Sequence, residues 1–276
     1  MARSHPIETK SFLDRIPQWV SVLALGAFLV GAWQLIVSLE LVARILLPGP
    51  AETLEQIVTT AQGILTGDHV AEALWITFQE VLWGFLAAAV LGFGLGVVVG
   101  ETLLGQRAVM PYLVAFNALP KVAFAPVFVA WLGFGMESKI AMALFIAFFP
   151  VIVDTAAGLA TAERSSIMLF QSMGASRWQT LWKLKLPHAL PFIFAGLKTA
   201  SVFAVVGAVV GEYLGGGSGL GELIRLSSQY LNLARVFALI FYLGLIGIAL
   251  FAAVGWLERR IVFWHQPDPT EVVSAA

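Results

Sequence analysis

The sequence predicts an all-α integral membrane protein with six transmembrane helices. Hydrophobic residues make up 59% of the 276 residues and charged residues only 12%, about half of the roughly 25% that is usual in soluble domains. Crossing about 30 Å of hydrocarbon takes about 20 helical residues, and six apolar stretches are long enough. They lie near residues 18–39, 74–99, 110–133, 138–160, 189–213 and 233–257.

The first stretch is predicted to be a retained transmembrane helix. Its apolar run from Trp19 to Leu39 is longer than the core of a cleavable signal peptide, which has about 7–15 residues. A signal anchor would have the same pattern, and Leu41-Val42-Ala43 is a weak candidate for a cleavage site.

The connection from Glu40 to Ala73 is predicted to hold an amphipathic helix that lies against the bundle or the membrane interface. After Leu47-Pro48-Gly49-Pro50, apolar residues follow at the spacing i, i+3, i+4, i+7, which places them on one helix face: Leu54, Ile57, Val58 and Ala61. Closing the outside of the fold is the favoured role of this helix, and cargo contact is the alternative.

The second and third stretches differ in their glycines and prolines. The second has three glycines on one helix face, which favours close packing against a neighbour: Gly92, Gly96 and Gly100. The third contains Pro111, Pro120 and Pro126, and because proline removes a backbone donor, a kinked or broken helix is expected. Such a break persists in a membrane only where protein or water satisfies the freed carbonyl groups, so this helix is expected to line a cavity.

Two connections flank the fifth stretch. The segment 161–188 contains four cationic residues and two tryptophans, Trp178 and Trp182, and it is amphipathic at helical spacing. It can lie on the membrane surface or dock another protein. The glycine-rich segment from Gly215 to Gly221 is expected to shape an outer gate, to meet a binding protein, or to form an ordinary re-entrant turn.

The distribution of Lys and Arg predicts that both termini are cytoplasmic, because cytoplasmic loops carry the excess of these residues. With the amino terminus inside, ten of them lie on the cytoplasmic side: Arg3, Lys10, Arg15, Arg107, Arg164, Arg177, Lys183, Lys185, Arg259 and Arg260. Four lie on the outer side: Arg44, Lys139, Arg225 and Arg235.

Several function classes lack the residues that they need. Cysteine is absent and the four histidines are scattered, so no metal site is predicted. The chain has no phosphate-binding G-x-x-x-x-G-K-[ST] loop, no H-E-x-x-H and no G-x-S-x-G, which makes an intramembrane enzyme the least favoured class. The net charge of -1 and the lack of a basic block do not indicate a nucleic-acid-binding surface.

The segment 161–188 carries a resemblance to a known family. Gly174 is followed, after nine residues, by Leu184 and then by Leu186-Pro187. This pattern resembles the G-x9-I-x-L-P part of the signature loop of binding-protein-dependent ABC importer permeases. The sequence departs from the family upstream of the glycine, where Met168-Leu169-Phe170 stands in place of the usual Glu-Ala-Ala.

Further motifs between Leu47 and Trp264 are similar to the nitrate, sulfonate and taurine permease group. In chain order they read LPGP, GFLAAAVLGFGLGVVVG, ALPKVAFAPVFVAWLGFG, FFPVIV, GASRW, LPHALPFIFAGLK and GSGLGELI. TFQEVLWGF, with Glu80, and AVVGAVVGEYLG, with Glu212, resemble more closely the permeases for thiamine precursors, riboflavin and related heterocycles.

The resemblance implies a type I importer permease bundle over residues 18–260, with cytoplasmic segments at 1–17 and 261–276. It implies a bacterial inner-membrane homodimer, two ATP-binding subunits that hold ATP and Mg, and an external binding protein that delivers a small solute. The permease itself would then have no cofactor and no enzymatic activity. The implied ATPase-coupling residues are Phe170, Gly174, Ala175, Ser176, Arg177, Trp178, Leu184, Leu186 and Pro187.

Five ionisable residues fall within or near the predicted spans: Glu80, Lys121, Asp154, Lys198 and Glu212. A charge at membrane depth costs about 2.5–3.5 kcal/mol on insertion scales and usually faces the bundle interior or a watery cavity. They are therefore candidates for the translocation pathway, and structural pairing is the other interpretation. A secondary transporter or channel that uses such buried charges is the alternative function, but it should have internal inverted repeats, and no convincing repeat is found.

Overall fold

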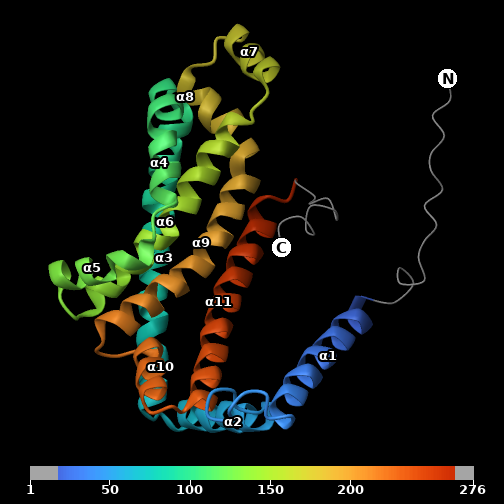
Figure 1. The fold of residues 1–276 in the computed structure, drawn as a ribbon. Helices are drawn as coiled ribbons and strands as arrows, with labels where there is room; N and C mark the ends of the chain where they lie inside the picture. The colour runs from blue at the N-terminus through green and yellow to red at the C-terminus, as the bar shows by residue number, and fades with distance from the viewer. Residues whose placement is uncertain (1–17, 265–276) are drawn as a thin grey trace, which may run out of the picture.

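The computed structural model describes residues 18–264, and every regular element in that range is helical (Figure 1). Five helices are long and apolar enough to cross a membrane, and a bent pair makes a sixth when it is counted as one span. The five are α1 (Gln18–Ser38), α3 (His69–Glu101), α6 (Met136–Ala160), α9 (Leu186–Gly215) and α11 (Leu233–Ile261). The predicted all-α class is confirmed. The predicted segment 1–17 and residues 265–276 of the predicted tail lie outside the described residues.

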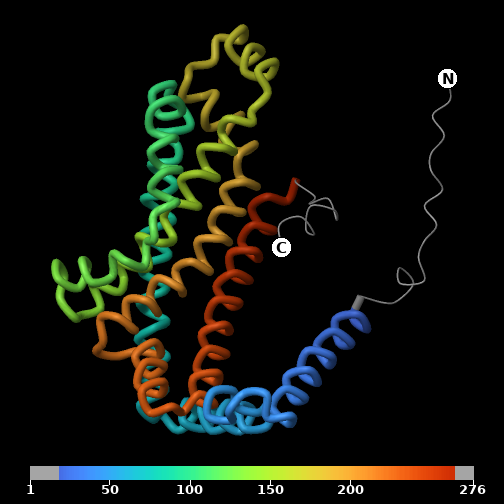
Figure 2. Tube along the Cα trace, viewed as in Figure 1, coloured from blue at the N-terminus to red at the C-terminus, as the bar shows by residue number. Residues whose placement is uncertain are grey.

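Helices α3, α6 and α9 pack against one another and form the core of the bundle, and α11 lies beside α9 (Figure 2). Glycines permit the close approach. A Cβ atom added at Gly96 of α3 would lie 2.6 Å from the Thr155 Cβ of α6, and one added at Gly211 of α9 would lie 3.0 Å from the Lys139 Cα of α6. The predicted close packing of the glycine face on α3 is confirmed, because a Cβ atom added at Gly92 or Gly96 would lie less than 3.0 Å from a side chain of α6.

The third predicted span is broken, as its prolines indicate. Helix α4 (Met110–Asn117), which follows the short π-helix η2 (Gly105–Val109), and the pair η3 (Lys121–Phe124) and α5 (Ala125–Leu132) meet at 86°. The break occurs at Pro120, which precedes η3. Pro111 lies at the start of α4, just after η2, and Pro126 lies at the start of α5, just after η3, so each proline stands where the helix changes from a π- or 3₁₀-turn to an α-turn. As a result, α5 leaves the bundle sideways between its two ends (Figure 1).

Short helices lie at both ends of the bundle. The amphipathic helix predicted after the first span is present as α2 (Pro50–Thr66), and it lies at the same end as α10 (Leu220–Gln229). The opposite end holds α7 (Arg164–Ser172) and α8 (Arg177–Thr180). We refer to these as the α2 end and the α7 end.

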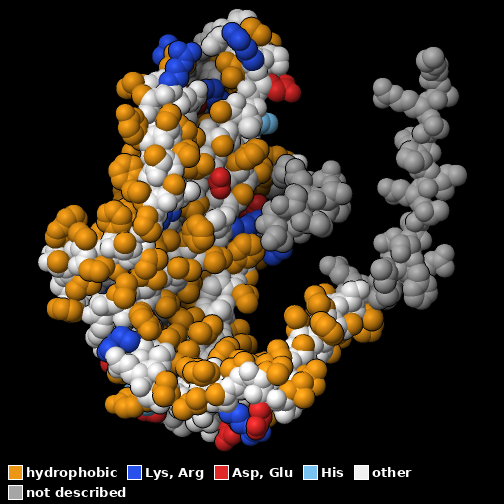
Figure 3. Space-filling model, viewed as in Figure 1, with side chains coloured by type: hydrophobic (Ala, Val, Ile, Leu, Met, Phe, Trp, Pro, Cys, Tyr) orange, Lys and Arg blue, Asp and Glu red, His pale blue; other side chains and the backbone are white. Residues whose placement is uncertain are grey.

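Helix α1 stands beside the bundle rather than within it (Figure 1). Nearly all of its side chains are exposed, and it is held mainly at its foot, where the Trp33 Nε1 donates a hydrogen bond to the Pro48 carbonyl at 3.1 Å. Figure 3 shows a flank dominated by hydrophobic side chains, with most Lys, Arg, Asp and Glu side chains gathered toward the two ends. Such a surface is compatible with hydrocarbon and not with bulk water.

Candidate functional site

The first half of the predicted coupling segment is a helix that ends in a tight turn. Helix α7 ends at Ser172 with Met173 as its C-cap, and the next residue, Gly174, has a φ of 77° in the left-handed region. The Ala175 N–H donates to the Phe170 carbonyl and the Gly174 N–H donates to the Gln171 carbonyl, each at 3.0 Å. These are the two bonds of a Schellman motif. Glycine adopts positive φ without steric cost, which gives the signature glycine a physical reason.

The second half of the segment is the start of the fifth long helix. Ser176 caps α8, because its Oγ accepts a bond from the Gln179 N–H at 3.2 Å while Gln179 Oε1 accepts one from the Ser176 N–H at 2.8 Å, the reciprocal pair of a capping box. Helix α8 continues through the π-helix η4 (Leu181–Lys185) into α9.

The loop predicted over 161–188 is therefore shorter than expected, and this corrects the prediction. Leu184, Leu186 and Pro187 lie in continuous helix rather than in a loop. The reason is the wide turn of η4 directly before Pro187. Proline lacks an N–H and crowds the preceding turn, and a π-helical turn accommodates this without ending the helix.

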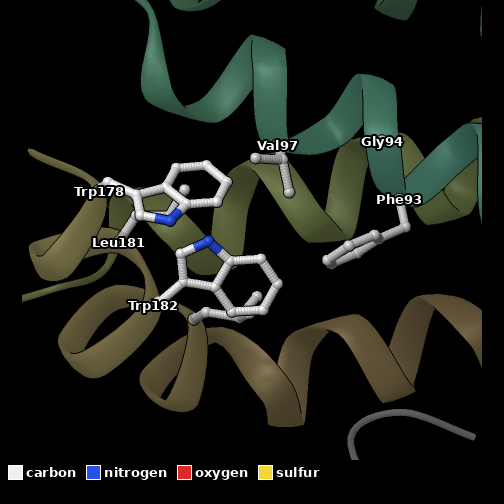
Figure 4. Close-up of a pocket in the computed structure, with 7 residues that line it drawn as sticks. Phe93, Gly94, Val97, Trp178, Leu181 and Trp182 are labelled. Atoms are coloured by element: carbon white, nitrogen blue, oxygen red, sulfur yellow. The ribbon is translucent and has the colours of Figure 1, made fainter.

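The two tryptophans of this segment lie toward the bundle. Trp178 and Trp182 form an edge-to-face pair with ring centroids 5.4 Å apart, and they lie across from Phe93 and Val97 of α3 (Figure 4). They line an apolar cavity of about 150 Å³. An ion pair between Lys185 and Glu101, with Nζ and Oε1 2.9 Å apart, joins the end of α3 to the same region.

Helix α7 presents uncovered apolar side chains beyond the bundle. Met168, Leu169 and Met173 are 56%, 59% and 76% exposed, and α7 projects at the tip of the molecule (Figure 1). Exposed apolar clusters of this kind are typical of interaction surfaces. Of the two predicted roles of the segment, docking of another protein fits a projecting helix better than lying flat on a membrane.

A carboxylate network is buried near the α2 end. Glu212 of α9 is fully buried, and its two oxygens accept hydrogen bonds from the Thr77 hydroxyl and the Gly221 N–H, each at 2.5 Å. The Thr77 oxygen in turn accepts a bond from the Leu220 N–H at 2.8 Å. Glu212 and Thr77 thus bind the first N–H groups of α10, which carry partial positive charge. The glycine-rich turn before α10 is held against α3 and α9 in this way.

Two further ionisable residues are buried near this network. Glu80 is 1% exposed and lies beside Glu212, and neither of its carboxyl oxygens has a hydrogen-bond partner among the described residues. Lys139 is 2% exposed and donates to the Phe134 carbonyl at 2.8 Å. The sequence places Lys139 in an outer connection, but the structure buries it in the first turn of α6. The predicted span 138–160 already includes Lys139, but the burial of its side chain depends on how α6 packs against α9.

The structure separates the other three intramembrane candidates. Lys198 of α9 forms an ion pair with Glu258 of α11, with Nζ and Oε2 2.5 Å apart. Asp154 of α6 is half-buried and lies against Gly196 of α9. Lys121 lies at the break between α4 and η3. Of the five candidates, only Glu80 and Glu212 are brought together.

A polar cavity of about 240 Å³ opens at the α2 end, between the start of α3 and the glycine-rich turn. It is lined by His69, Glu72 and Glu222, among others. Nearby, hydrogen bonds from the ring and the backbone of His69 lower the pKa of the exposed Asp68. The hydrogen bonds that Arg225 donates to the Glu222 carboxylate raise the pKa of the Arg225 guanidinium above its ordinary value. These groups are therefore charged at neutral pH.

Comparison with known proteins identifies the family. The family model described as "Binding-protein-dependent transport system inner membrane component" matches residues 81–263. The formylaminopyrimidine transport permease protein ThiX of Halalkalibacterium halodurans is 36% identical over 80% of this chain and 86% of its own length. The riboflavin transport system permease protein RibX of Chloroflexus aurantiacus is 37% identical over 58% of this chain and 60% of its own. The taurine transport system permease protein TauC of Escherichia coli is 30% identical over 87% of each chain.

A solved structure agrees on the fold. A chain of the MetNI methionine ABC transporter, in an inward-facing conformation, matches with a TM-score of 0.61 at 18% identity, over 69% of this chain and 95% of that one. The helical bundle, the motifs from Leu47 to Trp264 and the match over residues 81–263 agree with one another. This chain therefore belongs to the binding-protein-dependent inner membrane components and is a permease subunit of an ABC importer.

Proposed function

We propose that two copies of this permease pair around a central pathway, and that two separate ATP-binding subunits bind ATP and Mg and drive transport. An external binding protein would deliver the solute. The chain contributes no phosphate-binding loop of its own, so the energy has to come from partner subunits. ATP binding and hydrolysis on those subunits would move the helices between outward-open and inward-open arrangements.

The observation that carries this proposal is the projecting α7 with its Schellman turn. The uncovered side chains of Met168, Leu169 and Met173 form an apolar surface at the tip of the molecule, and helix-in-groove docking uses such surfaces. We assign α7 to the cytoplasmic side, where both termini would also lie. The excess of Lys and Arg predicted for that side supports this orientation.

In this proposal some of the predicted coupling residues lie beside the surface that contacts the ATPase, and the others connect that surface to α9. Phe170 lies in α7 beside the contact residues, Gly174, Ala175 and Ser176 form the turn that follows, and Arg177 begins α8. Trp178, Leu184, Leu186 and Pro187 lie in the helix that transmits its movement to α9. Because Met168-Leu169-Phe170 replaces the acidic sequence of the family, the docking contact is expected to be mainly apolar.

The cargo is proposed to be a small heterocycle, such as a pyrimidine or a flavin. The similarity to ThiX and RibX, whose names give formylaminopyrimidine and riboflavin, supports this choice over a sulfonate, taurine or nitrate. Of the five intramembrane charges, Lys121 has the strongest claim to the pathway. The bonds of Glu212 and the ion pair of Lys198 support structural roles for these two, and Glu80 and Asp154 remain pathway candidates.

Reconstitution tests the proposal. The permease, its ATPase and its binding protein are placed in liposomes, and ATP hydrolysis and uptake are measured with pyrimidines, flavins, sulfonates and nitrate. We expect one loaded binding protein to stimulate ATP hydrolysis and uptake. Leu169→Glu should lower this stimulation about tenfold, the effect of losing one good apolar contact. Gln171→Glu adds the same charge to α7 outside the apolar surface and should leave the stimulation unchanged. Uptake that needs no ATPase would refute the proposal and favour an ion-driven transporter.

A further inference from the structure

We propose that Lys121, Asn117 and the ring cluster around Phe145 form one wall of a cargo site for a planar heteroaromatic ring that carries hydrogen-bond acceptors. This inference rests on the proposed function and names the cargo-binding residues within it. The second copy of the permease would supply the opposite wall.

The Lys121 ammonium is held in a defined position. Its Nζ donates to Asn117 Oδ1 at 2.6 Å and lies 4.6 Å from the centroid of the Phe149 ring. No carboxylate lies within ion-pair distance of it among the described residues. An ammonium has three donors, and Asn117 takes one, so two remain for another molecule.

The broken backbone beside Lys121 also requires polar partners. The chain breaks between Asn117 and Lys121, with Pro120 at the corner, and the two halves diverge by 86°. The corner lies between the two ends of the bundle (Figure 1). Broken backbone and charge are tolerated at that depth only where they face protein or a watery cavity. Lipid therefore cannot be what this corner faces.

Aromatic rings adjoin the ammonium. Phe145 lies at the centre of a cluster, with ring centroids 5.1 Å from Phe124, 5.5 Å from Phe128 and 5.8 Å from Phe149. Phe149, under Lys121, is buried, whereas Phe145, Phe124 and Phe128 are only partly covered. An accessible aromatic surface thus lies next to an ammonium with free donors.

This combination selects a chemical class. A flat ring stacks on partly exposed phenylalanines, while a carbonyl oxygen or ring nitrogen at its edge accepts a bond from Lys121 or from the Asn117 amide. A sulfonate or nitrate would use the ammonium but would gain nothing from the ring cluster. The site therefore fits a heteroaromatic cargo better than a small inorganic or aliphatic anion.

The test measures binding of riboflavin, formylaminopyrimidine and taurine to the complete transporter in lipid nanodiscs, without binding protein. Lys121→Met and Phe145→Leu should each weaken binding of the two aromatic probes about tenfold, the effect of losing one charged hydrogen bond or one good ring contact. Lys121→Arg should retain binding. Phe251→Leu, which removes an exposed ring on α11, is the matched control and should bind as the wild type does.

Three results would overturn the inference: no binding of either aromatic probe to the wild type, equal binding in the variants, or taurine binding that depends on Lys121 but not on Phe145. The failure of the proposed function has a different signature, which is the absence of ATP-dependent uptake by the wild-type transporter. Thermal unfolding of each variant shows that reduced binding does not come from loss of the fold.

Discussion

Glu212 illustrates at the scale of single residues how this chain keeps a carboxylate inside its bundle. Its side chain is fully buried, yet both oxygens have donors, the Thr77 hydroxyl and the Gly221 N–H. A buried polar group without a partner costs about 1–3 kcal/mol, and a charged one costs more, so the two donors offset part of the cost of burial. Thr77 also accepts a bond from the Leu220 N–H, and its hydroxyl therefore satisfies groups on two helices.

Thr77→Val should lower the free energy of unfolding by about 1–3 kcal/mol, because one oxygen of Glu212 and the Leu220 N–H then lose their partner. Thermal unfolding in detergent or nanodiscs measures the change. Thr155→Val is the matched control, since the buried Thr155 hydroxyl has no partner among the described residues and its removal should be neutral or stabilising. Equal losses in the two variants would contradict the role of Thr77.

At the scale of elements, the segment between α6 and α9 owes its shape to local chain chemistry. Gly174 allows the turn that ends α7, and the capping box of Ser176 and Gln179 begins the next helix. The wide turn of η4 then lets the helix pass through Pro187. Each feature acts within a few residues, so the segment holds its shape without being enclosed by the bundle.

Gly174→Ala should cost about 1 kcal/mol locally, because alanine is strained at positive φ. An added Cβ meets nothing within 4 Å, so the loss comes from the backbone conformation alone. We expect little change in thermal unfolding but a weaker ATPase response to the loaded binding protein.

The control for this variant is Gly244→Ala in α11, where the Cβ also meets nothing within 4 Å. The backbone there is helical, and alanine should stabilise it by about 0.5–1 kcal/mol. If ATP hydrolysis responds normally to the loaded binding protein in both variants, the Schellman turn has no part in coupling.

At the scale of the whole molecule, the bundle depends on how closely its central helices approach. Helix α6 lies against α3 on one side and α9 on the other, and both neighbours present glycines to it. Lipid is as apolar as the side chains, so the association relies on close packing rather than on the hydrophobic effect. The buried ionisable residues Glu80, Glu212 and Lys139 lie in the same three helices.

Gly96→Ala should destabilise the bundle by about 1–3 kcal/mol through overpacking, since its Cβ would lie 2.6 Å from Thr155 Cβ and 3.0 Å from the Ile152 carbonyl oxygen. Gly94→Ala, two residues away on the same helix with nothing within 4 Å, should not destabilise it. Thermal unfolding of the two variants compares them directly. If Gly96→Ala unfolds at the same temperature as Gly94→Ala, α3 and α6 are not closely packed at Gly96.

The sequence by itself determined the class of the protein, its spans, the break at the proline-rich helix, the glycine face of α3 and the family. These depend on composition, on helical periodicity and on backbone chemistry, all of which act over a few turns of chain. The sequence motif also located Gly174, because a left-handed turn after a helix is a local property.

Only the tertiary structure decided which polar residues meet. Thr77 and Glu212 lie far apart in the chain, and their hydrogen bond depends on the register in which α3 and α9 pack. The same holds for Lys198 with Glu258, and for the ring cluster beside Lys121, whose rings come from η3, α5 and α6. A shift of one residue along a helix turns a side chain by about 100°, so local pattern cannot determine such contacts; helix packing does.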